Sequence, residues 1–226
     1  MYTIQKNLTK LRQNQCTYFL DPKELAQIKG KLKKGEYSIY YPYNDSENVI
    51  LYTHKIPEVI LYEIKVKTPI RHQDILGALF SLNISKELFG DILIIDNHYY
   101  VYLLPIVRNY FESNFLQVRN SSIELEEIPI DTLKDYERSY ETIECIVSSN
   151  RIDTVISSLI HVGRSNITDF MKNKEILLNY DYLTNSSYKL KEGDTFSIKR
   201  IGKFKYNGIL KHTKSNHIII EVLKYL

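Results

Sequence analysis

The sequence is poor in the residues and segments that mark secreted, membrane-spanning or disulfide-stabilised proteins. It has two cysteines, eight glycines and no tryptophan among 226 residues. Cys16 and Cys145 show neither the spacing of a metal site nor that of a disulfide framework, so we interpret them as ordinary thiols. No apolar run has the length of a membrane span, and the first residues have no signal-peptide core. We therefore expect a cytoplasmic protein with no membrane partner.

Catalytic signatures are missing as well. No glycine-rich loop follows a predicted strand, no Cys/His nucleophile pair is present, and the six histidines are scattered. We therefore expect a protein that is not an enzyme, with no catalytic residue, no metal, no other cofactor and no small-molecule substrate. An enzyme that modifies rRNA or tRNA is one alternative, and a protein-interaction scaffold is another.

The net charge of +3 conceals an uneven distribution. Residues 1–36 carry 8 Lys/Arg against 3 Asp/Glu, and residues 151–211 carry 11 against 6. Between them, residues 37–150 carry 9 Lys/Arg against 17 Asp/Glu. Because clustered cations attract phosphate groups, we expect polyanion binding at the two basic ends rather than in the acidic middle.

The local pattern predicts an α+β protein with three parts. Residues 1–35 form a basic helical segment, in which Asp21-Pro22-Lys23-Glu24 has the cap, proline and acid of a helix start; this helix should run to about Leu32. Residues 36–140 should form a split βαβ domain of the ferredoxin/RRM-like kind. Residues 141–226 should form a third domain that ends in a strand.

The middle domain is predicted from its alternation of strand-like and helix-like segments. The expected strands are 59–66, 92–95, 99–104 and 123–128, and the expected helices are 72–82 and 105–115. Asp96-Asn97 should form a tight turn, and residues 36–41 and 49–52 an extra hairpin. Tyr62, Tyr99, Tyr100 and Tyr102 lie on strands where RRM-like modules stack bases. Packing is favoured over stacking, because the region is acidic and alternating tyrosines are common in sheets.

The third domain is expected to contain two short helices on a small sheet. Apolar residues at helical spacing predict a helix over residues 151–161 that Gly163 ends. Ser165 is placed to cap a second helix, Asn166 to Lys172, and the strands should be 176–178 and 195–201. Cations flank these elements. The predicted RNA-binding residues are Arg151, Asp153, Arg164, Ser165, Asn166, Lys172, Lys174, Lys199, Arg200, Lys203 and Lys205.

Four short motifs in this domain resemble the S4 RNA-binding domain. They are Arg151-Ile152-Asp153, Gly163-Arg164-Ser165, the run Ile176 to Asn179, and Gly193-Asp194. The resemblance implies an RNA-binding surface, in which Asp153 would orient Arg151. The family's usual glycine before the first strand is replaced by Asn173-Lys174, and we expect Asn173 to allow the left-handed turn.

A wider resemblance covers nearly the whole chain. FLDPKE at residues 19–24, RHQDILGALFSLNISKELFGDI at 71–92, LEEI at 125–128 and the final IIIEVLKYL are similar to the YlmH family of bacterial S4 proteins. That resemblance implies a monomeric, non-catalytic factor that binds large-subunit rRNA and tRNA on the ribosome. It also implies a part in ribosome-associated quality control of stalled subunits that carry peptidyl-tRNA. YlmH proteins are also associated with cell division, which supports the scaffold alternative.

Overall fold

The computed structural model describes residues 2–13, 15–33 and 35–226, apart from the side chains of Tyr2, Arg164 and Ser165. The chain divides into an N-terminal unit that ends at Glu137 and a C-terminal unit, Arg138–Leu226. Both units combine helices with antiparallel sheets, so the predicted α+β class is confirmed. Among the described helices, none has the length and apolar character needed to cross a membrane.

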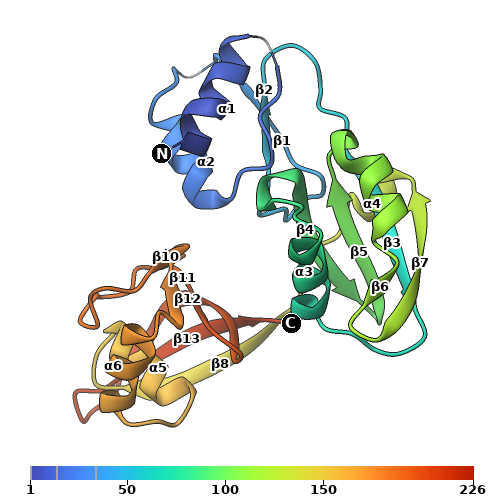
Figure 1. Ribbon diagram of the computed structural model, residues 1–226. Coiled ribbons are helices and arrows are strands. Elements are labelled where there is room, and N and C mark those ends of the chain that lie inside the picture. The colour runs from blue at the N-terminus through green and yellow to red at the C-terminus, as the bar shows by residue number, and fades with distance from the viewer. Residues whose placement is uncertain (1, 14, 34) are drawn as a thin grey trace. The chain divides into compact units, whose positions relative to one another are not determined.

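The N-terminal unit begins with two helices and a hairpin (Figure 1). These are α1 (Tyr2–Arg12), α2 (Pro22–Lys29), β1 (Ser38–Tyr40) and β2 (Ile50–Tyr52). The predicted helix start is confirmed, because Asp21 Oδ1 accepts from the Glu24 N–H at 2.8 Å and Glu24 Oε2 accepts from the Asp21 N–H at 3.2 Å. The helix is shorter than predicted, since it ends at Lys29 before Gly30. Ile28 and Leu51 share one core with α1 residues.

A five-stranded antiparallel sheet forms the rest of the unit. Its elements are β3 (Ile60–Val66), α3 (His72–Ser81), η1 (Lys86–Leu88), β4 (Phe89–Ile95), β5 (His98–Leu103), η2 (Pro105–Val107), α4 (Arg108–Asn114), β6 (Gln117–Val118), β7 (Ser121–Ile128) and η3 (Ile130–Leu133). The strand order is β4-β5-β3-β7-β6. Asp96 and Asn97 have φ of 49° and 65°, as a two-residue hairpin turn requires. This turn was predicted from the sequence.

Apolar residues pack on both faces of this sheet. On one face, Ile64 and Val101 pack with Leu79 of α3 and Phe111 of α4. On the other, Leu61 and Leu93 pack with Phe19, Tyr43 and Ile50 from the N-terminal segment. Gly90 permits this second contact, because a Cβ at that position would lie 2.8 Å from the Phe19 ring. The segment before β3 therefore covers part of the sheet face that α3 and α4 do not cover.

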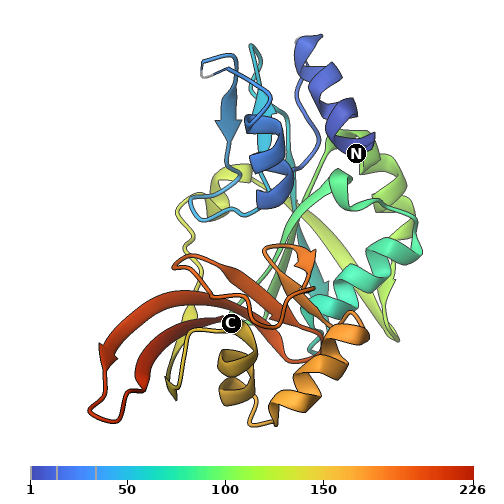
Figure 2. The same ribbon diagram turned by 90° about the vertical axis from the view of Figure 1, so that its left-hand side faces the viewer.

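The C-terminal unit has a larger sheet than the sequence predicted. Two helices, α5 (Ile152–Leu159) and α6 (Arg164–Lys172), accompany β8 (Tyr140–Val147), β9 (Ile176–Leu178), β10 (Asp181–Tyr182), β11 (Thr195–Ile198), β12 (Gly202–His212) and β13 (Ile218–Tyr225). The order is β10-β9-β11-β12-β13-β8. Figure 2 shows β12 and β13 as a long, curved hairpin. The predicted 195–201 strand ends early, at Ile198, because the chain turns there into β12.

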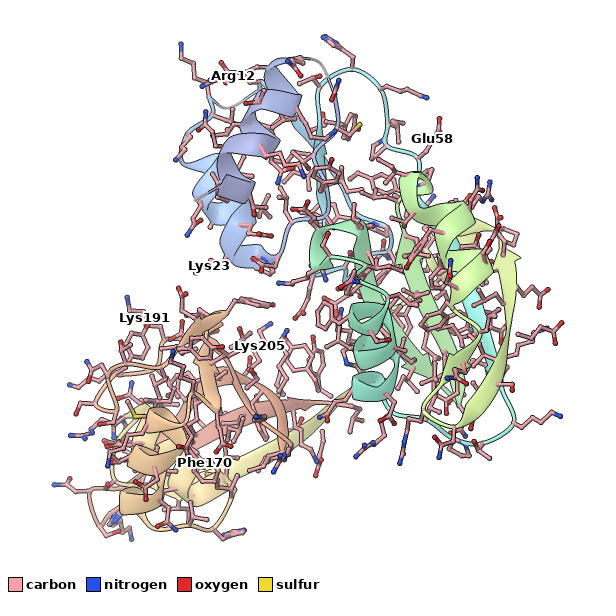
Figure 3. All side chains as sticks on the ribbon, in the orientation of Figure 1. Arg12, Lys23, Glu58, Phe170, Lys191 and Lys205 are labelled. Carbon is pink, nitrogen blue, oxygen red and sulfur yellow. The ribbon has the colours of Figure 1, made fainter. Side chains whose placement is uncertain are left out.

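The two helices cover only one face of this six-stranded sheet. Ile156 of α5 and Ile167 of α6 share a core with Phe196, Phe204 and Val222, whose side chains point to the same side. Phe170 of α6 packs against this core, whereas Lys205 lies on the opposite face (Figure 3). We call that opposite side the open face.

Candidate nucleic-acid interface

Arg151 and Asp153 form a bidentate ion pair where α5 begins. Arg151 donates from Nε to Asp153 Oδ1 at 3.1 Å and from Nη2 to Oδ2 at 2.6 Å. Burial alone would raise the pKa of Asp153, but the hydrogen bonds from Arg151 and from the N–H and hydroxyl of Thr154 hold it below its usual value. The expected orientation of Arg151 by Asp153 is thus observed. The Asp153 side chain itself is buried, so only Arg151 presents a charge to solvent here.

The start of α6 differs from the prediction. The helix begins at Arg164, and its N-cap is Gly163, with no side-chain cap. Ser165 therefore lies within the first turn and is not the cap, and Gly163 does not end α5, which stops at Leu159. Arg164 and Ser165 were predicted to bind RNA, but their side chains lie outside the described part of the structure. Asn166 is exposed in the first turn, where its N–H donates to the Gly163 carbonyl at 3.0 Å.

Four predicted cations meet near the end of α6 and the β11–β12 turn. Lys172 is the last residue of α6 and Lys174 follows the helix, whereas Lys199 and Arg200 occupy the turn. The Lys199 N–H donates to the Glu175 carbonyl at 2.8 Å, which joins the two segments. All four side chains are exposed. We call these four residues the cationic edge.

Backbone conformation in the cationic edge corrects one expectation. Lys174 has a φ of 54°, whereas Asn173 caps α6 with a φ of −78°. The lysine, not the asparagine, therefore adopts the left-handed turn that a glycine usually takes. Arg200 has a φ of 67° in the β11–β12 turn. Both cations thus occupy backbone conformations that non-glycine residues seldom adopt.

Lys203 and Lys205 lie apart from the cationic edge, on the open face. Their register partners on β11 are Ser197 and Thr195. The Lys203 ammonium lies 4.9 Å from the centroid of the Tyr180 ring and 4.6 Å from that of Tyr225. The eleven predicted residues therefore do not form one patch, and those with described side chains divide among the α5 start, the α6 start, the cationic edge and the open face.

The strand tyrosines of the N-terminal unit are structural. Tyr62, Tyr99 and Tyr102 are buried, and Tyr100 is half-buried beside His98. The Tyr62 hydroxyl donates to Glu112 at 2.5 Å, and burial together with this contact raises the pKa of Tyr62 to about 12. The buried rings of Tyr62, Tyr99 and Tyr102 cannot stack on bases without unfolding the sheet, which agrees with the predicted packing role.

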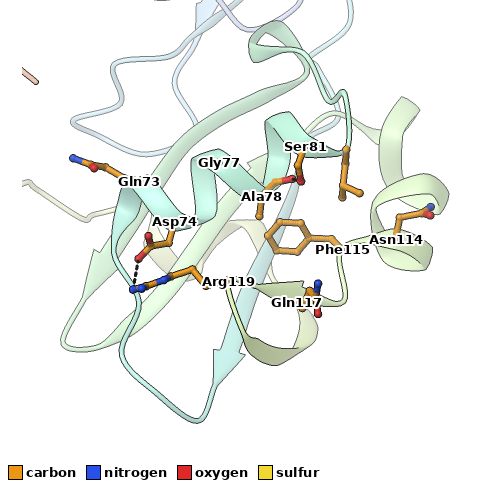
Figure 4. A pocket seen from close by; sticks show the side chains of 10 residues that line it. Gln73, Asp74, Gly77, Ala78, Ser81, Asn114, Phe115, Gln117 and Arg119 are labelled. Atoms are coloured by element: carbon orange, nitrogen blue, oxygen red, sulfur yellow. Dashed lines mark hydrogen bonds and ion pairs between the residues drawn. The ribbon is translucent and has the colours of Figure 1, made fainter. Parts of the chain in front are cut away.

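A groove on the helix side of this sheet was not predicted. It has a volume of about 440 Å³ and runs between α3 and β6 (Figure 4). Gln73, Asn114 and Gln117 line it with amides, and Arg119 lies 3.8 Å from Asp74 at one end. Arg71 also pairs with Asp74, and its hydrogen bond is the main reason that the Asp74 pKa is lowered. The sequence predicted a helix over residues 72–82, which carries Gly77 and Ala78, but it did not predict β6, which is only two residues long.

Comparison with known proteins adds three findings. Residues 55–132 match a family described as "Putative RNA-binding domain in YlmH". The chain is 25% identical over 213 residues to ribosome-associated protein quality control protein P2 of Bacillus subtilis (strain 168), covering 88% of this chain and 83% of that protein. A solved structure, cell division protein ylmH from Streptococcus pneumoniae, is similar with a TM-score of 0.49 and 19% identity, over 59% of this chain and 93% of that one.

Proposed function

We propose that this chain, which belongs to the YlmH family, is a non-catalytic RNA-binding factor that acts on the ribosome. The name of the Bacillus subtilis relative supports the ribosomal setting, because the similarity extends over 88% of the chain. The name of the matched family supports RNA as the ligand. Such a factor needs no cofactor and no small-molecule substrate, and it would work in the cytoplasm.

In finer detail, the protein would bind large-subunit rRNA and tRNA as a monomer. Its C-terminal unit would act as an S4-type domain, and its task would be quality control of stalled subunits that carry peptidyl-tRNA. The S4-like motifs Arg151-Ile152-Asp153 and Gly163-Arg164-Ser165 support this placement. The positive charge of the C-terminal unit also supports this placement, because residues 138–226 carry 14 Lys/Arg against 9 Asp/Glu.

The cationic edge is the observation that carries the proposal. Lys174 and Lys199 are 25 positions apart in the sequence, and a backbone hydrogen bond between their neighbouring segments brings these exposed cations to one place. Among the described residues, only Lys172 of the four has an acidic partner, Asp169 at 3.5 Å. Several solvated cations at one edge favour contact with a phosphate backbone.

The family match offers a competing location, since it covers residues 55–132 of the N-terminal unit. That region carries 7 Lys/Arg against 11 Asp/Glu, and its aromatic rings are largely buried. Its groove near Arg119 is the part best suited to an RNA strand, because amide side chains can hydrogen-bond bases and the guanidinium can pair with a phosphate. The experiment below therefore tests both units in the full chain.

Sucrose-gradient sedimentation with immunodetection tests the proposal. At low salt the protein should travel with free large subunits, rather than with whole ribosomes or polysomes. The double variant Lys199→Gln/Arg200→Gln should move toward the top of the gradient. Lys211→Gln/Lys214→Gln is the matched control, because it removes the same charge from exposed positions of the same unit and should sediment as wild type.

Two results would contradict this placement. If the wild-type protein stays in the top fractions at low salt, it does not bind ribosomal subunits. If Arg119→Gln releases the protein while the cationic-edge variant does not, the RNA lies on the N-terminal unit. Binding of a protein partner in nuclease-treated, ribosome-free extract would instead favour the scaffold alternative.

A further inference from the structure

A row of side chains crosses the open face from one edge of the sheet to the other. The strand register places six residues side by side, one from each strand, in the order Tyr140, Tyr225, Lys203, Ser197, Leu177 and Tyr182. Three of the six are tyrosines, and two of these lie at the two ends of the row. We call these six residues the open-face row.

Cations from distant parts of the sequence lie over the rings of this row. The Lys203 ammonium is 4.6 Å from the Tyr225 centroid, and the Arg138 guanidinium is 5.9 Å from it. Lys174 is 5.6 Å from the centroid of Tyr182. Tyr180, in the turn before β10, adds a ring 4.9 Å from Lys203 and a hydroxyl that accepts from Lys203 Nζ at 3.0 Å. The chain thus gathers alternating rings and positive charges on one surface.

The carboxylates of β8 and β13 do not share this row. Glu141 points to the other side of β8 and pairs with Lys224 at 2.8 Å. Glu144 and Glu221 are on the open face, but they lie four residues along their strands from Tyr140 and Tyr225, or about 13 Å. A polyanion would therefore meet favourable charge along the row and repulsion only farther along β8 and β13.

We propose that the open-face row binds a short stretch of single-stranded RNA. Flat rings interleaved with cations fit unpaired nucleotides, because a base can stack on a ring while its phosphate contacts an adjacent ammonium or guanidinium. A duplex would hide its bases from these rings. Tyr182 is 56% exposed and is the most accessible ring of the row. This inference deepens the proposed function. It concerns the sheet face opposite the helices, which shares Lys174 with the cationic edge.

Fluorescence anisotropy with the full-length chain tests the open-face row. The probes are fluorescein-labelled 12-nucleotide oligouridylate and oligoadenylate, with an RNA hairpin of equal phosphate number as comparator. Tyr182→Leu and Tyr225→Leu should each weaken oligonucleotide binding by about fivefold to a hundredfold, the range found for loss of one stacking ring. Tyr225→Phe keeps the ring and should bind as wild type. Binding of the hairpin should change little.

The charge contribution is tested by Lys203→Gln beside Lys214→Gln. Both substitutions remove one positive charge, but Lys214 lies in the β12–β13 turn, far along the strands from the row. Lys203→Gln should weaken oligonucleotide binding at least fivefold more than Lys214→Gln. Thermal melts of every variant show whether the fold is kept. Equal losses for the two lysines, or unchanged binding by both leucine variants, would overturn the proposal.

Sedimentation of the same proteins separates this inference from the proposed function. If wild-type protein travels with large subunits but does not bind the oligonucleotides, the open-face row fails and the ribosomal function stands. If it binds the oligonucleotides through Tyr182 and Tyr225 but stays at the top of the gradient, the row stands and the ribosomal function fails. If it does neither, both proposals fail.

Discussion

The two large sheets use tyrosine for opposite purposes. In the N-terminal unit, Tyr62 and Tyr102 are buried between the sheet and the segments that cover it. In the C-terminal unit, Tyr182 and Tyr225 lie on a face that no helix of that unit covers, with cations over their rings. The difference shows that aromatic residues on a strand are not by themselves a sign of nucleic-acid binding. Burial and nearby charge decide which role a ring has.

The first prediction tests the structural role of tyrosine in the N-terminal unit. Tyr102→Ala removes a fully buried ring stacked at 5.7 Å on Tyr43, and it should lower the free energy of unfolding by about 3–5 kcal/mol. Urea denaturation followed by circular dichroism measures this loss. Tyr102→Phe is the control and should cost little, because the Tyr102 hydroxyl has no hydrogen-bond partner among the described residues. If Tyr102→Ala weakens RNA binding at unchanged stability, the contrast between the sheets is wrong.

The second prediction concerns salt and the charge of the C-terminal unit. If its cations neutralise roughly five phosphates, the plot of log affinity against log salt should have a slope of about −3.5 to −4.5, depending on strandedness. A fourfold rise in salt would then weaken binding by about a hundredfold or more. Anisotropy titrations with an rRNA fragment at several salt concentrations measure the slope. A slope near zero would mean that these cations are only solvated.

The features that could be predicted from the sequence are those that depend on residues close together in the chain. The α2 cap and the Asp96-Asn97 turn were predicted, because each depends on a few neighbouring residues. The long pairing of β8 with β13 was missed, since its partners lie about 80 positions apart. The grouping of Arg138, Tyr180, Lys203 and Tyr225 was missed for the same reason. Helix caps and tight turns can be predicted from neighbouring residues, whereas the register of distant strands cannot.

The third prediction uses the Arg151–Asp153 pair. Asp153→Asn removes charge-assisted hydrogen bonds from a buried position, so it should destabilise the C-terminal unit by about 1.5–3 kcal/mol at neutral pH. The pKa of Asp153 is lowered in the folded state, so its contribution is present above about pH 4 and is lost as the pH falls through the lowered value. Thermal melts between pH 7 and pH 3 check this. Wild type should lose more stability in acid than Asp153→Asn, and parallel losses would contradict the assignment.

The fourth prediction returns to the start of α6. Arg164→Ala is expected to lose a phosphate contact worth roughly 1.5–3 kcal/mol, or about tenfold or more in RNA affinity, with little change in folding. Arg164→Lys should restore only part of the affinity, because an ammonium lacks the planar fork of a guanidinium. Anisotropy against an rRNA fragment compares both variants with Tyr100→Ala. If Tyr100→Ala weakens binding more than Arg164→Ala at an unchanged melting temperature, the RNA lies on the N-terminal unit.

The pairing of β8 with β13 also governs when the C-terminal unit can fold. β8 opens the unit, and among the described strands its neighbour in the sheet is β13, which follows every other strand of the unit. During synthesis, β8 therefore cannot pair with β13 until about 80 further residues have been made. Pairing between such distant segments also slows folding. Tyr140 and Tyr225 meet only at that moment. The open-face row is thus completed last, which makes RNA binding through it a property of the finished unit alone.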